Sequence, residues 1–291
     1  MMVSIITPSY NRAHLLGRLY MSLCKQIDMN FEWIVIDDGS TDDTSNLLGE
    51  LQKEHNKPFL LKYRKKNNGG KHTAINEGVK YAQGELVLIL DSDDSLPDNS
   101  ISTIEYYYEQ IKDDVSFGGV CGYMAHHDGA IIGHGCDFDV LDTNSIDIRY
   151  KYHLKGDLAE VFKRDVLLEF PFPEIEGEKF CPESLVWNRI ATKYRLRFFN
   201  KVIYYRDYLE GGLTDYIVKI RMDSPVASMM TYSEMLRYKI PFVQKIKASV
   251  NYWRFAFCVG IMSKKVQLPC LWIWTIPMGY LMHMKDKKTV K

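Results

Sequence analysis

Three carboxylates follow an unbroken apolar run in the sequence. The run extends from Leu86 to Leu90, and Asp91, Asp93 and Asp94 come almost directly after it. Carboxylates this close repel one another, and burial adds a second cost to their charge. A divalent cation removes both costs, and a D-x-D spacing at a strand end suits a cation shared with phosphate oxygens. The segment therefore predicts a divalent-cation site.

Two other interpretations of this cluster are possible. An EF-hand calcium loop has acidic residues at the same spacing, but it needs Gly at its sixth position and Glu at its twelfth. This chain has Leu96 and Ser102 there, which excludes an EF-hand. A solvated turn followed by a helix cap at Asp98 is the second alternative, and the wholly apolar strand before the cluster argues against it.

Other polar clusters follow apolar runs earlier in the chain. "TPSYNR" begins at Thr7, and Asp37-Asp38-Gly39-Ser40 follows "FEWIVI". The loop from Asn67 to Lys71 is rich in glycine and precedes a helix, so its N–H groups either face a phosphate or form a plain turn. The chain contains neither GxGxxG nor GxxxxGK[ST], which leaves dinucleotide binding and P-loop hydrolysis without support.

The elements that must position these clusters alternate regularly. Strands are expected at 3–8, 31–38, 59–65 and 85–91, with helices at 12–26, 40–55, 71–83 and 100–112. This alternation predicts right-handed βαβ units, hence an α/β fold with a mostly parallel sheet flanked by helices. Ligands bind beyond the carboxyl ends of such strands, so the polar clusters should meet at one edge.

The second half of the chain is less regular. Strands are expected at 115–126, 158–163 and 196–205, and a helix at 182–194. We predict one α/β domain over residues 1–220, with a first half at about 1–115 and a second at 116–220. A helical tail covers 221–291.

Charge separates the tail from the domain. The net charge is zero, but residues 225–291 hold eleven Lys and Arg against two acidic residues, a net charge of +9, which leaves −9 for the rest. A basic tail on an acidic body favours an anionic partner for the tail. The six scattered cysteines have no zinc-type spacing, and no basic leader precedes the first strand, so a cytoplasmic protein is expected.

Four segments together resemble a known family. "SIITPSYNR", "EWIVIDDGSTDDT", "NNGGKHTAINEG" and "GELVLILDSDDSLPDN" are similar, in this order and spacing, to the N-terminal half of glycosyltransferase family 2. These are inverting transferases of GT-A fold, a Rossmann-like architecture. The resemblance implies a nucleotide-sugar donor, most often a UDP-sugar, and a Mn²⁺ or Mg²⁺ ion.

The resemblance also assigns roles to residues. Asp93 would bind the metal, together with Asp91, which also faces the ribose, and Asp94 would be a metal ligand or support one. Asp37 would bind the base. The other residues expected at the donor site are Thr7, Pro8, Tyr10, Arg12, Asp38, Asn68, Lys71, Asn76 and Ser92.

The catalytic base is the point where this chain departs from the family pattern. Members usually carry an acidic pair at the start of a helix well after the D-x-D, and here Glu183 is followed by Ser184. We expect Glu183 to be the base that deprotonates the acceptor hydroxyl. Asp157 is the alternative base, and a purely structural role for Glu183 at a helix N-terminus is the other interpretation. "GGLT" (211–214) is a candidate for a loop that closes over the donor.

The tail offers a second functional hypothesis. "LPCLWIWTIPMGYLMHM" (268–284) is apolar, contains two prolines, and is shorter than the ~20 residues of a spanning helix. Flanking lysines and its tryptophans favour a helix lying in an anionic membrane surface, so the protein would be peripheral on the cytosolic face. The alternatives are that this segment packs on the domain or lies in a homodimer interface.

We therefore expect transfer of a single sugar to a glycan or lipid-linked acceptor in cell-surface polysaccharide assembly, with no nucleic-acid partner. The absence of a QxxRW motif argues against a processive synthase. The alternative functions are a nucleotidyltransferase of similar topology and a catalytically inactive relative that binds a nucleotide sugar.

Overall fold

The computed structural model describes the chain except for residues 1, 55–56, 136, 207–215, 260–265 and 290–291. It divides into two compact units. The first contains Met1–Pro171 and Arg189–Asp207, and the second contains Phe172–Asn188 and Tyr208–Lys291. The first unit includes most of the predicted α/β domain, while residues 172–188 group with the tail.

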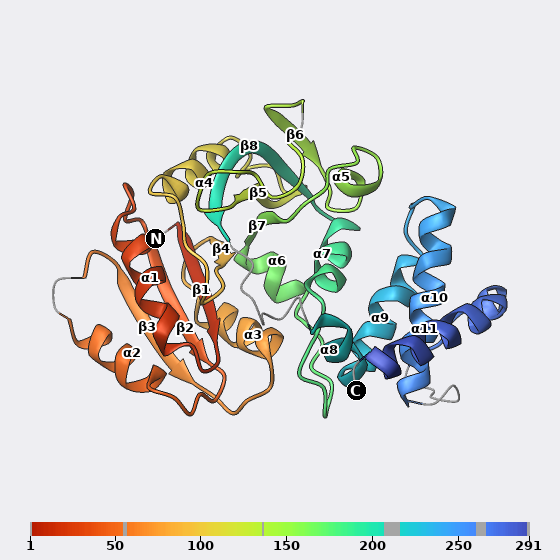
Figure 1. The fold of residues 1–291 in the computed structure, drawn as a ribbon. Helices are drawn as coiled ribbons and strands as arrows, with labels where there is room; N and C mark the ends of the chain where they lie inside the picture. Colours follow the sequence, from red (N-terminus) through yellow and green to blue (C-terminus); the bar gives the residue numbers. More distant parts are fainter. Residues whose placement is uncertain (1, 55–56, 136, 207–215, 260–265, 290–291) are drawn as a thin grey trace. The chain divides into compact units, whose positions relative to one another are not determined.

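The first unit is built on one mixed sheet, with strand order β3-β2-β1-β4-β7-β5-β8-β6 (Figure 1). Strands β3, β2, β1 and β4 run parallel, as do β5 and β8, whereas β7 and β6 are antiparallel to their neighbours. The predicted α/β fold with a mostly parallel sheet is confirmed. The strands are β1 (Val3–Ser9), β2 (Phe31–Asp37), β3 (Leu60–Lys65), β4 (Leu86–Ile89), β5 (Phe117–Ala125), β6 (Val140–Thr143), β7 (Leu158–Lys163) and β8 (Arg195–Tyr205).

Helices connect the strands and form most of the second unit. Up to residue 169 they are α1 (Ala13–Cys24), α2 (Thr44–Lys53), α3 (Lys71–Tyr81), α4 (Ser100–Glu109), α5 (Asp147–Tyr150) and α6 (Arg164–Glu169). They continue with α7 (Glu183–Ala191), α8 (Ile217–Asp223), α9 (Pro225–Met235), α10 (Phe242–Val259), the 3-10 helix η1 (Cys270–Thr275) and α11 (Ile276–Thr289).

Side-chain alternation along the central strands explains why helices cover both faces of the sheet. Ile5 of β1 and Trp33 of β2 point to one face, where they pack with Leu19 of α1. Ile6 points to the other face, where α3 approaches so closely that a Cβ on Gly78 would lie 2.5 Å from the Ile6 Cγ2 atom. Both faces are therefore covered, and the ends of the strands are left for polar residues.

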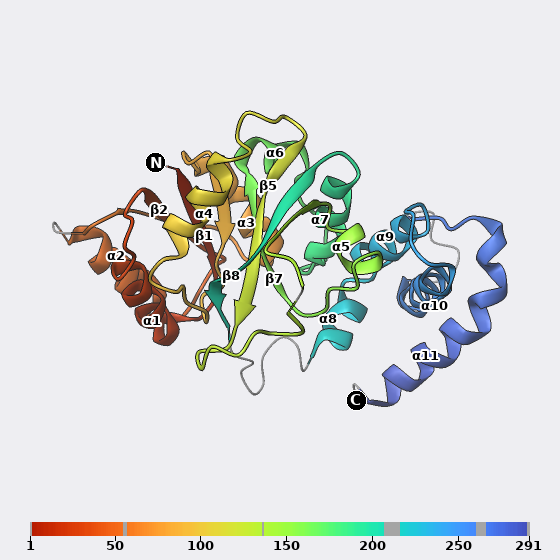
Figure 2. The same ribbon diagram turned by 90° about the horizontal axis from the view of Figure 1, so that it is seen from above.

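The second unit has its own apolar core. Met229 of α9 packs with Tyr252 and Phe255 of α10, and the rings of Tyr232 and Phe255 stack with centroids 6.0 Å apart. Helix α11 runs along the outside of α10 (Figure 2). None of the helices among the described residues is long and apolar enough to cross a membrane.

Candidate active site

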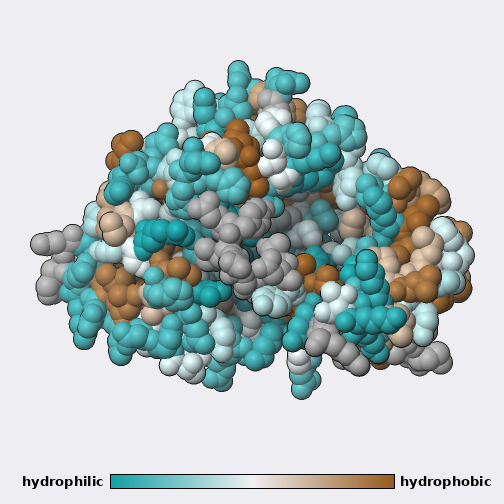
Figure 3. Space-filling model, viewed as in Figure 1, coloured by the Kyte–Doolittle hydropathy of each residue, from teal (hydrophilic) through white to brown (hydrophobic). Residues whose placement is uncertain are grey.

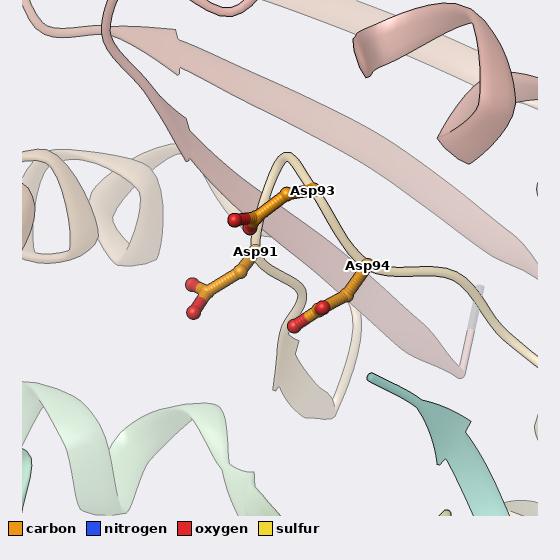
Figure 4. A group of neighbouring side chains, drawn as sticks. All are labelled: Asp91, Asp93 and Asp94. Atoms are coloured by element: carbon orange, nitrogen blue, oxygen red, sulfur yellow. The ribbon is translucent and has the colours of Figure 1, made fainter. Parts of the chain in front are cut away.

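The three predicted carboxylates converge at the end of β4. That strand ends at Ile89, and Asp91, Asp93 and Asp94 occupy the loop that follows. Each offers an oxygen that lies within 4.8 Å of those of the other two. Figure 4 shows the three side chains on the same side of the loop. Asp94 is buried and the other two are partly exposed.

Tyr204, near the end of β8, holds this loop in place. Its hydroxyl donates a hydrogen bond to Asp94 Oδ2 at 2.7 Å and accepts one from the backbone N–H of Asp91 at 3.0 Å. Because the hydroxyl is buried, both bonds are shielded from competition with water. One side chain therefore fixes two members of the cluster.

Two cations lie against the cluster. Lys71 Nζ, at the start of α3, is 2.6 Å from Asp91 Oδ1, and the Arg18 guanidinium of α1 donates to the backbone oxygen of Asp93. The predicted donor-site residue Lys71 and the predicted metal ligand Asp91 are thus brought together from separate segments. The ion pair offsets part of the repulsion within the cluster.

The repulsion that remains among the three carboxylates affects the pKa of Asp94. Burial, followed by the charge of Asp91, raises the pKa of Asp94 to about 8, although the hydrogen bond from Tyr204 lowers it. Burial also raises the pKa of Tyr204, which stays a neutral donor. A proton or a cation is needed to hold the three carboxyls together. Carboxylate oxygens are the ligands that Mg²⁺ and Mn²⁺ prefer, so the donor set fits such an ion.

Asp37 ends β2 with a fully buried side chain. Its Oδ1 accepts a hydrogen bond from the Ser40 N–H at 2.7 Å, and its Oδ2 accepts one from the Tyr63 hydroxyl at 3.0 Å. The carboxylate thus shapes the turn after β2. Its contact with a nucleotide base stays a prediction.

Asp38 has a role that the sequence did not indicate. Its two oxygens accept hydrogen bonds from the N–H groups of Gly69 and Gly70 at 2.9 and 2.7 Å, and Lys66 Nζ lies 2.9 Å from Oδ1. Two of the backbone donors that could have faced a phosphate, those of Gly69 and Gly70, are therefore occupied by a side-chain carboxylate before α3. Gly70 has φ +93°, a conformation that favours glycine.

The remaining predicted donor-site residues surround these groups. Thr7 is buried and its Oγ1 accepts a hydrogen bond from Trp33 Nε1 at 2.9 Å. Tyr10 is exposed beyond the end of β1, and Asn68 Nδ2 donates to the backbone oxygen of Asp38 at 2.9 Å. The others are Pro8 at the end of β1, Arg12 before α1, Asn76 on α3 and the buried Ser92 between the aspartates.

The two candidate bases lie in different units. Glu183 is the first residue of α7 and belongs to the second unit. Asp157 belongs to the first unit, just before β7, and its Oδ2 lies 2.9 Å from Arg206 Nη1. The predicted loop at 211–214 lies outside the described residues.

Comparison with known proteins decides the family. The model of Glycosyl transferase family 2 matches residues 4–128. Glycosyltransferase GlyG of Streptococcus pneumoniae is 32% identical over 214 residues, which are 70% of this chain and 69% of the relative. The GalNAc(5)-diNAcBac-PP-undecaprenol β-1,3-glucosyltransferase of Campylobacter jejuni is 39% identical over 220 residues, 73% of this chain and 67% of the relative. The chain belongs to glycosyltransferase family 2.

Solved structures agree on the fold of this family 2 glycosyltransferase. S. aureus TarS 1-349 in complex with UDP-GlcNAc superposes with a TM-score of 0.63 at 21% identity, covering 91% of this chain and 74% of TarS. The mannosyltransferase PcManGT of Pyrobaculum calidifontis, in complex with GDP-Man and Mn²⁺, gives a TM-score of 0.59 at 19% identity, covering 98% and 75%. The predicted family and enzyme class are confirmed, which sets aside a nucleotidyltransferase.

Three residues of this glycosyltransferase site escaped the sequence analysis. Tyr204 and Arg206 lie at the end of β8 and just after it, and Arg18 lies in α1. Tyr204 sits in an aromatic strand segment whose pattern indicates only burial. An isolated antiparallel bridge between Ser95 and Tyr205 joins the end of β8 to the loop that holds the cluster, and no local signal reveals that pairing.

Proposed function

We propose that this glycosyltransferase is an inverting, metal-dependent enzyme that moves a single sugar from a UDP-sugar to a lipid-linked or glycan acceptor. The convergence of Asp91, Asp93 and Asp94 carries this proposal, because such a cluster suits a cation bound to a diphosphate. Mn²⁺ or Mg²⁺ is the expected ion. TarS binds UDP-GlcNAc and PcManGT was solved with Mn²⁺, which supports the donor and the metal.

The proposed acceptor class is inferred from the name of one relative. The Campylobacter jejuni enzyme is named for an undecaprenol-linked saccharide, and it covers most of this chain. By this analogy a membrane lipid carries the acceptor hydroxyl. The same relative is named a glucosyltransferase, which supports transfer of a hexosyl group, and the TarS complex with UDP-GlcNAc supports an N-acetylhexosaminyl group as the alternative.

In the mechanism, the residues of this chain bind and orient the donor and deprotonate the acceptor hydroxyl. Asp37 and Asp91 would hold the nucleoside, and Asp93 with Asp91 would hold the metal. The bound metal would stabilise the negative charge that develops on the leaving diphosphate. Lys71, already paired with Asp91, brings a positive charge to the same place.

The reaction itself is a single displacement. The acceptor oxygen forms a bond to the anomeric carbon while the bond from that carbon to the diphosphate oxygen breaks. The acceptor proton passes to Glu183, our proposed base, and the nucleoside diphosphate leaves. Asp157 is the weaker candidate because accepting a proton would cost it the ion pair with Arg206.

A donor-hydrolysis assay tests the proposal. Release of UDP from a panel of UDP-sugars should require Mn²⁺ or Mg²⁺ and stop with EDTA, and Asp93→Asn should lower turnover about a hundredfold or more. The matched control is Asp98→Asn, an exposed aspartate of the same loop, which should behave as wild type. Full activity of Asp93→Asn, or activity in EDTA, would overturn the metal assignment.

The base is tested separately, by transfer to acceptor. Glu183→Gln should leave UDP binding unchanged and lower turnover roughly 10²- to 10⁴-fold. If Asp157→Asn shows this pattern instead, the base is Asp157. An enzyme that binds UDP-sugars but transfers nothing under any condition would be an inactive relative.

A further inference from the structure

Helix α11 packs inward through one glycine and two polar residues. Its buried residues are Gly279, His283 and Asp286, spaced so that they share one face of the helix. This pattern is the reverse of an ordinary surface helix, which buries an apolar stripe. Ile276 packs inward, but Met278, Leu281, Met282 and Met284 are left exposed.

Specific contacts with α10 fix the helix in this orientation. Asp286 accepts two hydrogen bonds from the Arg254 guanidinium, one of them 2.8 Å long, and His283 Nδ1 donates to the Arg254 carbonyl oxygen at 3.1 Å. At Gly279 an added Cβ would lie 2.9 Å from the Val250 carbonyl oxygen. Turning the helix would break the ion pair and bring larger side chains into the Gly279 contact.

The outer side is apolar and exposed. Leu271 of η1 is 73% exposed, Trp274 is 53% exposed and Leu281 is 68% exposed. With Met278 these residues recur at helical spacing, and we call the four of them the outer face. Figure 3 shows hydrophobic residues gathered over the helices that Figure 1 labels α10 and α11. Exposed apolar patches of this kind mark interaction sites.

Lysines continue the outer face along the same stripe. Lys285 and Lys288 follow Leu281 at intervals of four and three residues, and both are exposed, as is Lys287. A stripe of tryptophan, leucine and methionine that ends in lysines has the composition of helices lying in the interface of an anionic bilayer.

Charge also distinguishes among the occupants of this face. Residues 225–291 carry a net charge of +9, so two copies meeting through their outer faces would bring like charges together. An anionic lipid surface gains from the same charge. We propose that the outer face of α11, with Lys285, Lys287 and Lys288, docks the enzyme on an anionic membrane surface without spanning it.

Sedimentation with lipid vesicles tests this docking in the full-length protein. The wild type should bind vesicles of phosphatidylcholine with phosphatidylglycerol, and bind vesicles of phosphatidylcholine alone much more weakly. The double variant Leu271→Glu/Leu281→Glu should bind the anionic vesicles at least about tenfold more weakly. Lys285→Gln/Lys287→Gln/Lys288→Gln should weaken the binding about a hundredfold and remove the preference for anionic lipid.

Val115→Glu is the matched control, since Val115 is 85% exposed and lies in the first unit. It should bind vesicles as the wild type does. All three variants change exposed side chains, so thermal unfolding should show that they are folded. Failure of the wild type to bind anionic vesicles overturns the proposal. Unchanged binding of the Leu271→Glu/Leu281→Glu variant to anionic vesicles also overturns it. So does a wild-type protein that binds no lipid but forms a concentration-dependent dimer that this variant abolishes.

Discussion

At the scale of single residues, the site depends on holding three acidic side chains together. Asp94 is buried beside Asp91 and Asp93. Tyr204 donates a hydrogen bond to Asp94, Lys71 pairs with Asp91, and the pKa of Asp94 is raised. Such an arrangement costs stability in the absence of a counter-charge. Proteins retain arrangements of this kind at functional sites.

Tyr204→Phe tests how the cluster is positioned. The change removes the hydroxyl that joins Asp94 Oδ2 to the Asp91 N–H. Both groups then lose this hydrogen-bond partner at a site largely shielded from water. We expect the free energy of unfolding to fall by about 1–3 kcal/mol. Urea denaturation measures this, with Tyr205→Phe, the neighbouring tyrosine, as the control. Equal stability of the Tyr204→Phe variant and the wild type would show that the Tyr204 hydroxyl does not hold the loop.

Glu105 provides a prediction about pH. Burial, and then the neighbouring Asp28 carboxyl, raise the pKa of Glu105 to about 7. The folded protein therefore binds more protons than the unfolded chain between the unfolded value of about 4.3 and about 7, and stability falls as pH rises through that window. Glu105→Gln keeps an oxygen that accepts the hydrogen bond from the Asn30 side chain, and it removes the loss of stability with rising pH.

The variant should therefore be more stable than wild type at about pH 8, by about 1 kcal/mol after allowance for solvent screening, with a smaller difference at about pH 5. Thermal unfolding at both values measures it. Glu50→Gln, an exposed glutamate on α2, is the control and should show no such pH dependence. An identical gain at both pH values would contradict the assignment.

At the scale of elements, the N-terminus of α3 depends on a side chain from another segment. Asp38 supplies a negative charge where the helix dipole and the Gly69 and Gly70 N–H groups are positive. We expect Asp38→Ala to lower the free energy of unfolding by about 2 kcal/mol, since it removes these bonds and the ion pair with Lys66.

Urea denaturation again provides the measurement. Asp43→Ala is the matched control, because Asp43 also precedes a helix but is exposed, and its carboxylate accepts a hydrogen bond from the exposed Asn46 side chain. It should change stability by less than about 0.5 kcal/mol. A larger loss at Asp43 than at Asp38 would be inconsistent with this account of α3.

The sequence allowed the parallel half of the sheet to be predicted because its strands alternate regularly with helical segments, and β1, β2 and β4 are largely apolar and are followed by polar residues. The convergence of Asp91, Asp93 and Asp94 after β4 could be predicted for the same reason, while their role as metal ligands stays a prediction. The position of β7 between β4 and β5 could not, because "LAEVFK" shows a strand but neither its direction nor its neighbours. The hydrogen bonds that Asp38 accepts from Gly69 and Gly70 could not be predicted either, because these glycines come from a distant loop.

At the scale of the whole molecule, the chain combines an α/β unit built on one mixed sheet with a second, largely helical unit. The apolar tail segment predicted an interfacial helix, and the structure leaves Trp274 of η1 and Leu281 of α11 exposed. The sequence could not show that Gly279 and Asp286 lock that orientation against α10. The tail was expected to be amphipathic, but the direction of its polar face emerges only from packing.

The central claim is that the aspartate cluster binds a metal–nucleotide complex, and calorimetric titration with UDP tests it most directly. UDP should bind the wild type and Asp98→Asn in the presence of Mn²⁺ or Mg²⁺. Binding should weaken at least about tenfold when EDTA removes the metal or when Asp93 is changed to Asn. Equal affinity of UDP with and without metal, equal affinity for Asp93→Asn, or no binding of UDP under any condition would contradict the account.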